Sequence, residues 1–331
     1  MLKRLLAAGL IGALALGTVG CKKETPNLEA VVEQTAPFER TINGHQYKFE
    51  GNKIAEITSD EDNQASYGII SDAHGEAGKA KFFAEEFKKR GVDGIILTGD
   101  LPSNEGLRSG RTDSRADKSE IKEVLEAVAQ TGLPILVIPG NHEQKPDYTQ
   151  ALAEVTAKYE NVIDMTKFRV FNGDDVDFVS LPGYQTFKIP GRQFIPDNGY
   201  WAKPEFIRST GKLRNGLDNA VVLITHGCGK TASPGPATIY NGKDVGDETT
   251  TQMMVENNIP FAVCGHIHEA GGLAATHDGK TVAQNEWAKQ FSANFGGLED
   301  WKHLDGKTYS GMAGVLTVKG DQAKFEMLYL Q

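Results

Sequence analysis

The sequence predicts an α/β (α+β) fold, and three observations lead to this prediction. Short apolar runs with the length of buried strands alternate with amphipathic helical patterns from Tyr67 onward. Asn-Gly pairs separate strand-like segments in two places, as they do in β-hairpins. No internal repeat, low-complexity block or linker divides the chain after residue 37, so we expect residues 38–331 to form one domain.

The elements of the first half are defined by apolar periodicity and by turn residues. Asn43-Gly44 is a strong hairpin turn, and Phe82, Phe83 and Phe87 form a stripe at helical spacing that we expect in the core. In chain order, the expected elements are a hairpin over 38–58, a strand over 67–71, a helix over 77–90, a strand over 94–97, a helix over 119–130, a strand over 134–138 and a helix over 148–159.

The second half is predicted by the same signals. Asn172-Gly173 and Gly320-Asp321 are the turns of two hairpins. The expected elements are strands over 168–171 and 176–180, an apolar strand over 220–225, a helix over 247–257, an apolar strand over 259–263 and a closing hairpin of 312–318 with 323–330.

The first 21 residues have the features of an export signal. Two basic residues precede the apolar run Leu5 to Leu16, which is too short to span a bilayer as a mature helix. Small residues then lead to Cys21, as in a bacterial lipoprotein signal, in which that cysteine becomes the lipidated first residue. The run departs from that signal at Thr18, where leucine is usual, and the alternative is an ordinary secretory signal. Residues 22–37 are polar, contain two prolines and predict a tether.

These features predict an exported protein that a lipid on Cys21 anchors to a membrane. Lys22, rather than aspartate, follows the cysteine, which by resemblance to lipoprotein sorting favours the outer membrane of a Gram-negative cell.

Only Cys228 and Cys264 remain in the mature chain. They could pair in an oxidising compartment, but two cysteines are too few for a disulfide framework, and we expect buried free thiols.

The charge balance excludes one class of partner. The chain has 35 Lys and Arg against 44 Asp and Glu, a net charge of -9. No general nucleic-acid binding is expected, because no basic field would attract phosphate backbones. A small phosphorylated substrate remains possible, since bound cations reverse the sign of the charge locally.

Five apolar strands each end in residues that can bind a metal. In α/β sheets, ligands bind beyond the carboxyl ends of strands, where loops converge. His266 and His268 lie two residues apart and project to the same side of an extended chain, roughly 6–7 Å apart. This spacing suits two ions roughly 3.5–4 Å apart, with one imidazole on each. The five stretches are Asp72-Ala73-His74, Gly99-Asp100, Gly140-Asn141-His142-Glu143, His226 and Gly265-His266-Ile267-His268.

In this order, over about residues 66–300, the five stretches resemble the calcineurin-like metallophosphoesterases. The resemblance implies a four-layer αββα sandwich of two mixed β-sheets flanked by helices, with a dinuclear metal centre. It places the first ion on Asp72, His74 and His268, the second ion on Asn141, His226 and His266, and Asp100 between the two as a bridge. Such oxygen and imidazole ligands suit Mn, Fe, Zn, Co or Ni without strong preference. His142 binds no metal in this scheme and would stabilise the transition state or protonate the leaving oxygen.

Together with the export signal, the resemblance implies an exported phosphohydrolase, similar to small bacterial members of the family. A metal-bridging hydroxide would attack phosphorus in line, in a phosphodiester or a small phosphomonoester. The alternative is a non-catalytic surface lipoprotein that uses the same fold as a binding module, although this chain retains every ligand named above. Gly229-Lys230-Thr231 resembles the end of a nucleotide-binding loop, but Ile224 stands where that motif needs its first glycine, which excludes it.

The segment Pro102 to Lys118, which directly follows Asp100, is predicted to be a loop near the metals. Its Arg108, Arg111 and Arg115 could bind the phosphate of a substrate through paired hydrogen bonds. The alternative is a solvated loop whose arginines pair with nearby aspartates.

Two glutamates and two further histidines complete the set of candidate residues. Glu143 and Glu269 flank ligands, and they either orient those ligands or face solvent. His277 and His303 have no such context and are expected on the surface.

Overall fold

The computed structural model describes residues 36–60, 62–103, 114–185 and 199–330. They belong to one unit, residues 32–331. The predicted signal with Cys21 lies outside the described residues, and so do Arg108 and Arg111. Of Arg115, only the backbone is described.

Most of the described strands belong to two mixed sheets. In spatial order, the nine-stranded sheet consists of β1 (Phe38–Ile42), β2 (His45–Glu50), β3 (Lys53–Glu56), β8 (Val170–Asn172), β9 (Val176–Leu181), β12 (Ala220–Gly227), β13 (Phe261–Gly265), β15 (Phe291–Asn294) and β14 (Ala274–Ala275). The six-stranded sheet consists of β19 (Gln322–Tyr329), β18 (Met312–Lys319), β4 (Gln64–Ile70), β5 (Gly94–Leu97), β6 (Ile135–Val137) and β7 (Val162–Asp164).

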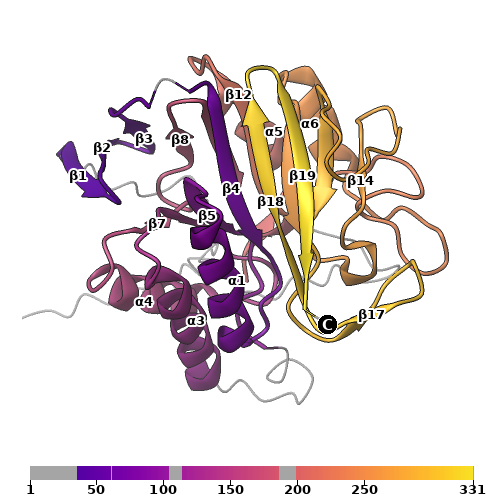
Figure 1. Cartoon of the computed structure of the whole chain (residues 1–331), viewed down its shortest axis with the longest axis horizontal. Coiled ribbons are helices and arrows are strands. Elements are labelled where there is room, and N and C mark those ends of the chain that lie inside the picture. The colour runs from indigo at the N-terminus through magenta and orange to yellow at the C-terminus, as the bar shows by residue number, and fades with distance from the viewer. Residues whose placement is uncertain (1–35, 61, 104–113, 186–198, 331) are drawn as a thin grey trace, which may run out of the picture. The chain divides into compact units, whose positions relative to one another are not determined.

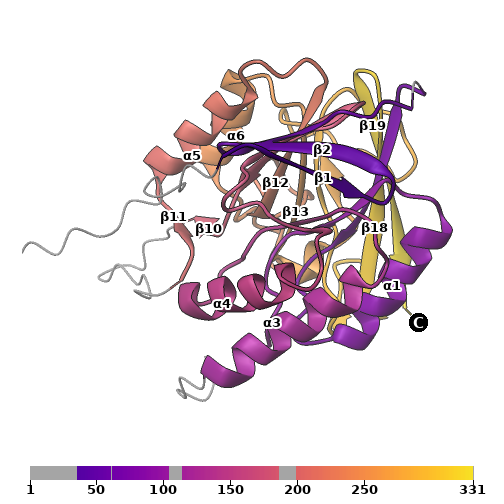
Figure 2. The same ribbon diagram turned by 90° about the vertical axis from the view of Figure 1, so that its left-hand side faces the viewer.

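Helices cover the outer face of each sheet (Figure 1). On the six-stranded sheet these are α1 (Ala77–Lys89), α3 (Ser114–Ala129) and α4 (Lys145–Thr156). On the nine-stranded sheet they are α5 (Pro204–Gly211) and α6 (Glu248–Glu256). Figure 2 shows the two helical groups on opposite sides of the strands. Short pieces complete the fold: β10 (Tyr184–Gln185) with β11 (Trp201–Ala202), β16 (Trp301–Lys302) with β17 (Thr308–Tyr309), and the 3₁₀ turns η1 (Lys212–Arg214) and η2 (His268–Ala270).

The strands alternate between two cores, because successive side chains point to opposite faces. In β5, Ile95 and Leu97 pack under the helices, while Ile96 packs between the sheets. In β12, Val222 and Ile224 face the inter-sheet core and Leu223 faces α5 and α6. The four-layer αββα prediction is therefore confirmed.

Parallel pairing brings the ends of these strands together. β4, β5, β6 and β7 are mutually parallel in one sheet, and β9, β12, β13 and β15 are parallel in the other. The loops after β4, β5 and β6 consequently leave one edge of the first sheet, and those after β12 and β13 leave one edge of the second.

Among the described residues, no helix is both long and apolar enough to cross a bilayer.

Several expectations were wrong in detail. α3 begins at Ser114 instead of residue 119, so the last five residues of the predicted loop are helical; Asp117 lies in the first turn, where a negative charge is favourable. Phe82 is 46% exposed, because α1 buries only the face of Phe83 and Phe87. His303 is buried beside Tyr309, whereas the sequence placed it on the surface.

The prediction of free thiols was also wrong. Cys228 and Cys264 form a disulfide, with Cα atoms 5.3 Å apart. The two cysteines lie at the ends of adjacent parallel strands, β12 and β13, and this pairing has no local signal in the sequence.

Candidate metal centre

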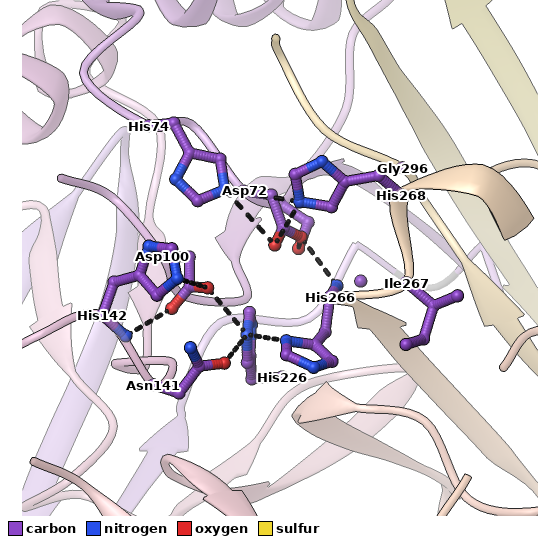
Figure 3. A network of polar contacts seen from close by, with 12 residues as sticks. Asp72, His74, Asp100, Asn141, His142, His226, His266, Ile267, His268 and Gly296 are labelled. Carbon is purple, nitrogen blue, oxygen red and sulfur yellow. Dashed lines mark hydrogen bonds and ion pairs between the residues drawn. The ribbon is translucent and has the colours of Figure 1, made fainter. Parts of the chain in front are cut away.

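The seven predicted ligands and His142 lie together, at the carboxyl ends of strands from both sheets (Figure 3). β4, β5 and β6 lead to Asp72 and His74, to Asp100, and to Asn141 and His142, respectively. From the other sheet, His226 lies within β12, and His266 and His268 follow β13.

The first cluster consists of Asp72, His74 and His268, whose ligand atoms lie within 4.8 Å of one another. Asp72 Oδ1 is 3.2 Å from His268 Nε2 and 3.8 Å from His74 Nε2. The two Nε2 atoms are 3.3 Å apart. His74 Nδ1 lies 3.2 Å from the Pro102 carbonyl oxygen, which can only accept, so Nδ1 donates there and Nε2 is left to bind a ligand.

The second cluster consists of Asp100, His226 and His266, again within 4.8 Å. His226 Nε2 is 3.1 Å from Asp100 Oδ2, 3.1 Å from Asn141 Oδ1 and 3.2 Å from His266 Nδ1. Its Nδ1 donates to the Thr98 carbonyl oxygen at 3.1 Å, so Nε2 faces the cluster. Carboxylate, amide and imidazole donors that converge in this way fit a divalent metal site.

His142 also reaches the centre. Its Nε2 is 3.6 Å from Asp100 Oδ2, and its backbone N–H donates to Asp100 Oδ1 at 2.9 Å. His74, Asp100 and His142 form a further group whose ligand atoms lie within 4.8 Å. Asp100 thus lies between the two clusters, with His142 beside it.

The backbone around the centre is strained. Asp72, His74, Asp100 and His266 have φ of 47°, 44°, 53° and 65°. All other described non-glycine residues with positive φ are asparagines, which adopt this conformation more easily. Such strain costs of order 1–3 kcal/mol per residue and persists only where the surroundings fix it. We infer that the sharp turns after the strands are maintained because they direct these side chains to one point.

Close packing of the loops requires glycine at two positions. A Cβ atom at Gly140 would overlap Asp100, and one at Gly265 would overlap Ser71 and Asp72. The loops therefore approach each other more closely than any side chain would allow.

Glu143 is fully buried beneath the centre and orients two of its loops. Its carboxylate accepts hydrogen bonds from the backbone N–H groups of Gly140 at 2.7 Å, Leu101 at 2.8 Å and Asp100 at 3.3 Å. Burial and the charge of Asp100 raise the pKa of Glu143 to about 8, against the effect of these hydrogen bonds. The structure therefore supports the interpretation that Glu143 orients the ligands and does not face solvent. Glu269, the other flanking glutamate, is half-buried.

The charges of the centre compensate one another. Burial alone would raise the pKa of Asp100, but His226 and His142 outweigh it and hold that pKa well below its usual value. Burial would lower the pKa of His226, but Asp100 and Asp72 raise it to about 9. Burial and the charge of His226 lower the pKa of His266 to about 3. To bind a divalent cation through Nε2, the His226 ring would have to carry no proton on that atom.

Some residues that support the centre were missed by the sequence analysis. The Trp301 ring lies edge-on to His268, with centroids 4.6 Å apart. The Tyr184 ring lies 4.0 Å from that of His266. Asn294 Nδ2 contacts the carbonyl oxygens of Gly265 at 3.2 Å and of Ile267 at 2.9 Å. Asn294 ends β15, beside β13. The sequence analysis predicted no strand there, so the strand-end rule that found the ligands did not reach it.

Comparison with known proteins gives one family. Residues 66–270, more than half of the 331-residue chain, match the model of the family described as Calcineurin-like phosphoesterase. No curated protein matches the chain at a significant level.

Solved structures share the fold at low sequence identity. The TT1561 protein of Thermus thermophilus is 11% identical with a TM-score of 0.54, over 81% of this chain and 99% of that one. Another crystal structure, at 12% identity, has a TM-score of 0.58 over 81% and 100% of the two chains. A dimetal phosphatase from Danio rerio is 11% identical with a TM-score of 0.46, over 81% and 99%. The two scores above 0.5 support the sandwich fold.

Proposed function

Because the chain belongs to the calcineurin-like phosphoesterase family, we propose that it hydrolyses phosphate esters at a centre of two divalent ions. The observation that carries this proposal is the convergence of two carboxylates, one amide and four imidazoles from both sheets on one buried site. Asp72, His74 and His268 would hold the first ion, Asn141, His226 and His266 would hold the second, and Asp100 would be shared by the two.

The bridging role is supported by the position of Asp100. Its Oδ2 lies 3.1 Å from a ligand of the second ion, and its side chain also belongs to a cluster with His74 of the first. A shared carboxylate offsets the repulsion between two dications. When bound, such a pair of ions activates water at neutral pH and neutralises phosphoryl oxygens. The donor set suits Mn, Fe, Zn, Co or Ni.

His142 is proposed to protonate the leaving oxygen. Its side chain is 11% exposed, at the border between the buried centre and solvent, where a substrate would approach. Burial lowers the pKa of His142, which disfavours the protonated ring, and the negative charge of Asp100 partly offsets this effect. The hydrogen bond from its backbone to Asp100 holds the ring beside the bridging carboxylate.

The substrate is proposed to be a phosphodiester or a small phosphomonoester. The test is reconstitution of the metal-free chain with Mn²⁺, followed by turnover of p-nitrophenyl phosphate and of its bis-ester. We expect hydrolysis that a chelator abolishes and metal restores, and the ratio of the two rates assigns the ester class. A chain that binds metal but hydrolyses neither ester would contradict the proposal.

The location is proposed on sequence grounds alone. The lipoprotein-type signal favours an exported protein anchored through Cys21, in the outer membrane of a Gram-negative cell. Cys21→Ser should then move the protein from the membrane fraction to the soluble fraction. Membrane association of the mutant after signal cleavage would argue against the lipid anchor.

A further inference from the structure

The Cys228–Cys264 disulfide joins the two strands that present His226 and His266. Cys228 follows His226 by two residues, and Cys264 precedes His266 by two. The cysteines are 2% and 0% exposed, so the link lies inside the fold, directly behind the site.

The link stands where the hydrogen-bonded pairing of these strands is interrupted. β12 and β13 pair regularly as far as Ile224 with Val263, and the register then shifts to Gly227 with Gly265. Two residues of β12, Thr225 and His226, therefore face a single residue of β13. Such a bulge disrupts the ladder and redirects a side chain. The same irregularity that directs His226 into the centre also removes hydrogen bonds that would fix the strand ends.

Separate contacts from the opposite sheet hold the His226 ring and the His266 backbone. His226 donates to Thr98, and the backbone N–H of His266 donates to Asp72 Oδ2 at 2.8 Å. Neither contact fixes β12 against β13. Among the described residues, the Gly227–Gly265 pairing and the disulfide do so beyond the bulge.

We propose that the Cys228–Cys264 disulfide positions His226 and His266 for the second ion, so that its loss weakens the binding of that ion selectively. This inference rests on the proposed two-ion centre. His226 Nε2 and His266 Nδ1 are 3.2 Å apart, and metal ligands must be held to within about 0.5 Å of their working geometry. A change in the separation of the strand ends moves both nitrogens at once.

The ligands of the first ion provide the contrast. His74 follows β4 in the other sheet and is oriented by Pro102, and His268 contacts Asp72. Asn294 donates to the carbonyl oxygens of Gly265 and Ile267, on either side of His266, so it supports the backbone of both histidines. The contrast therefore rests on Asp72 and His74, which follow β4 in the other sheet.

The test measures the affinity for each ion separately, by calorimetric titration of the full metal-free chain with Mn²⁺. In a His268→Ala background the remaining strong site is that of the second ion, and in a His226→Ala background it is that of the first. Into each we introduce Cys228→Ala together with Cys264→Ala, because a single remaining thiolate could itself bind metal. We expect the Kd of the second ion to rise roughly 10–100-fold, as for residues that orient a ligand, and that of the first to change less than twofold.

The control is Leu217→Ala, which destabilises the core on the helix side of the nine-stranded sheet without contact to the centre. It should leave both Kd values unchanged. A second pair, Cys228→Ser with Cys264→Val, repeats the test with different packing. If the binding of both ions is weakened equally, or the binding of neither is weakened, the inference is overturned while the two-ion centre stands. If the chain with both cysteines binds fewer than two ions, this inference and the proposed two-ion centre are overturned together.

Discussion

Two groups of carboxylates lie at the two ends of β4, and they differ in what surrounds them. At the carboxyl end, Asp72 is buried and contacts His268 at 3.2 Å. At the amino end, Asp60 and Asp62 are exposed and lie within 4.8 Å of the half-buried Asp175. The first group combines carboxylates with imidazoles, and the second gathers carboxylates alone.

The two groups also differ in their protonation. Although burial opposes it, His226 and His268 hold the pKa of Asp72 below its usual value. Burial, followed by the charges of Asp174 and Asp60, raises the pKa of Asp175 to about 6. Acidic residues brought together without compensation repel one another. The candidate metal centre therefore combines its carboxylates with histidines whose charges compensate them.

The largest expected effect comes from Asp100→Asn, which keeps the size of the side chain but removes the charge between the two clusters. We expect the loss of at least one metal equivalent, and a fall in turnover larger than the roughly 10–100-fold typical of residues that only support a ligand. Metal analysis and steady-state kinetics measure both.

Asp62→Asn is the matched control at the other end of β4. It should leave metal content and turnover unchanged. Full metal occupancy in Asp100→Asn would remove the bridging role.

The second effect separates binding from chemistry. His142→Ala should lower turnover by roughly 10²–10⁴-fold, the range for general acid catalysis, while both ions stay bound. His45→Ala, which removes a histidine bonded to Glu56 in the first hairpin, is the control. If metal is lost with His142, the side chain is a ligand, as its cluster with His74 and Asp100 would also permit.

The third effect concerns Glu143, which acts through its neighbours. Above the pKa of Glu143, where the side chain is a carboxylate, Glu143→Gln replaces one acceptor oxygen with a donor, so one backbone N–H of Leu101 or Gly140 loses its partner. This should lower the free energy of unfolding by about 1–3 kcal/mol and weaken metal binding roughly 10–100-fold. Glu269→Gln, beside His268 but half-buried, should change metal affinity less than twofold. Equal effects of the two substitutions would show that Glu143 has no special role.

The helices and strands that position the centre could be predicted because their signals are local. β5 is four buried residues, Gly94 to Leu97, and the Asp247 side chain caps α6 by accepting from Thr250 N at 2.7 Å. The start of α3 was missed, since its first turn is polar and has no apolar period. The pairing of β12 with β13 depends on the tertiary structure, and the disulfide was therefore predicted wrongly.

The candidate ligands could be named because each directly follows or ends an apolar strand. The distances between them could not be predicted, since each cluster combines residues from both sheets. Supporting residues such as Trp301 come from a short strand with little apolar pattern, so nothing in the sequence linked them to His268.

The smallest effect tests the acidic group at the amino end of β4. The folded pKa of Asp175, about 6, lies above its ordinary value of 3.8, so the folded state binds more protons than the unfolded state between these values. Stability should therefore fall as pH rises from about 4 to about 6, and the loss should persist at pH 7. Asp175→Asn removes this loss and should raise stability at pH 7 by less than about 1 kcal/mol, because solvent screens the charges around this half-buried group. Its amide oxygen can still accept the hydrogen bond from Gln64 N.

Urea unfolding at pH 4, 5, 6 and 7 measures this effect, and Asp278 supplies a control of opposite sign. Thr276 and Lys280 lower the pKa of Asp278, so its charge stabilises the folded state above its ordinary pKa, and that contribution is lost as pH falls. Asp278→Asn should therefore be slightly less stable than the unmodified chain at pH 7. A pH profile of Asp175→Asn parallel to that of the unmodified chain would show that the repulsion between the acidic side chains is screened by solvent. The contrast between the two ends of β4 would then rest on burial alone.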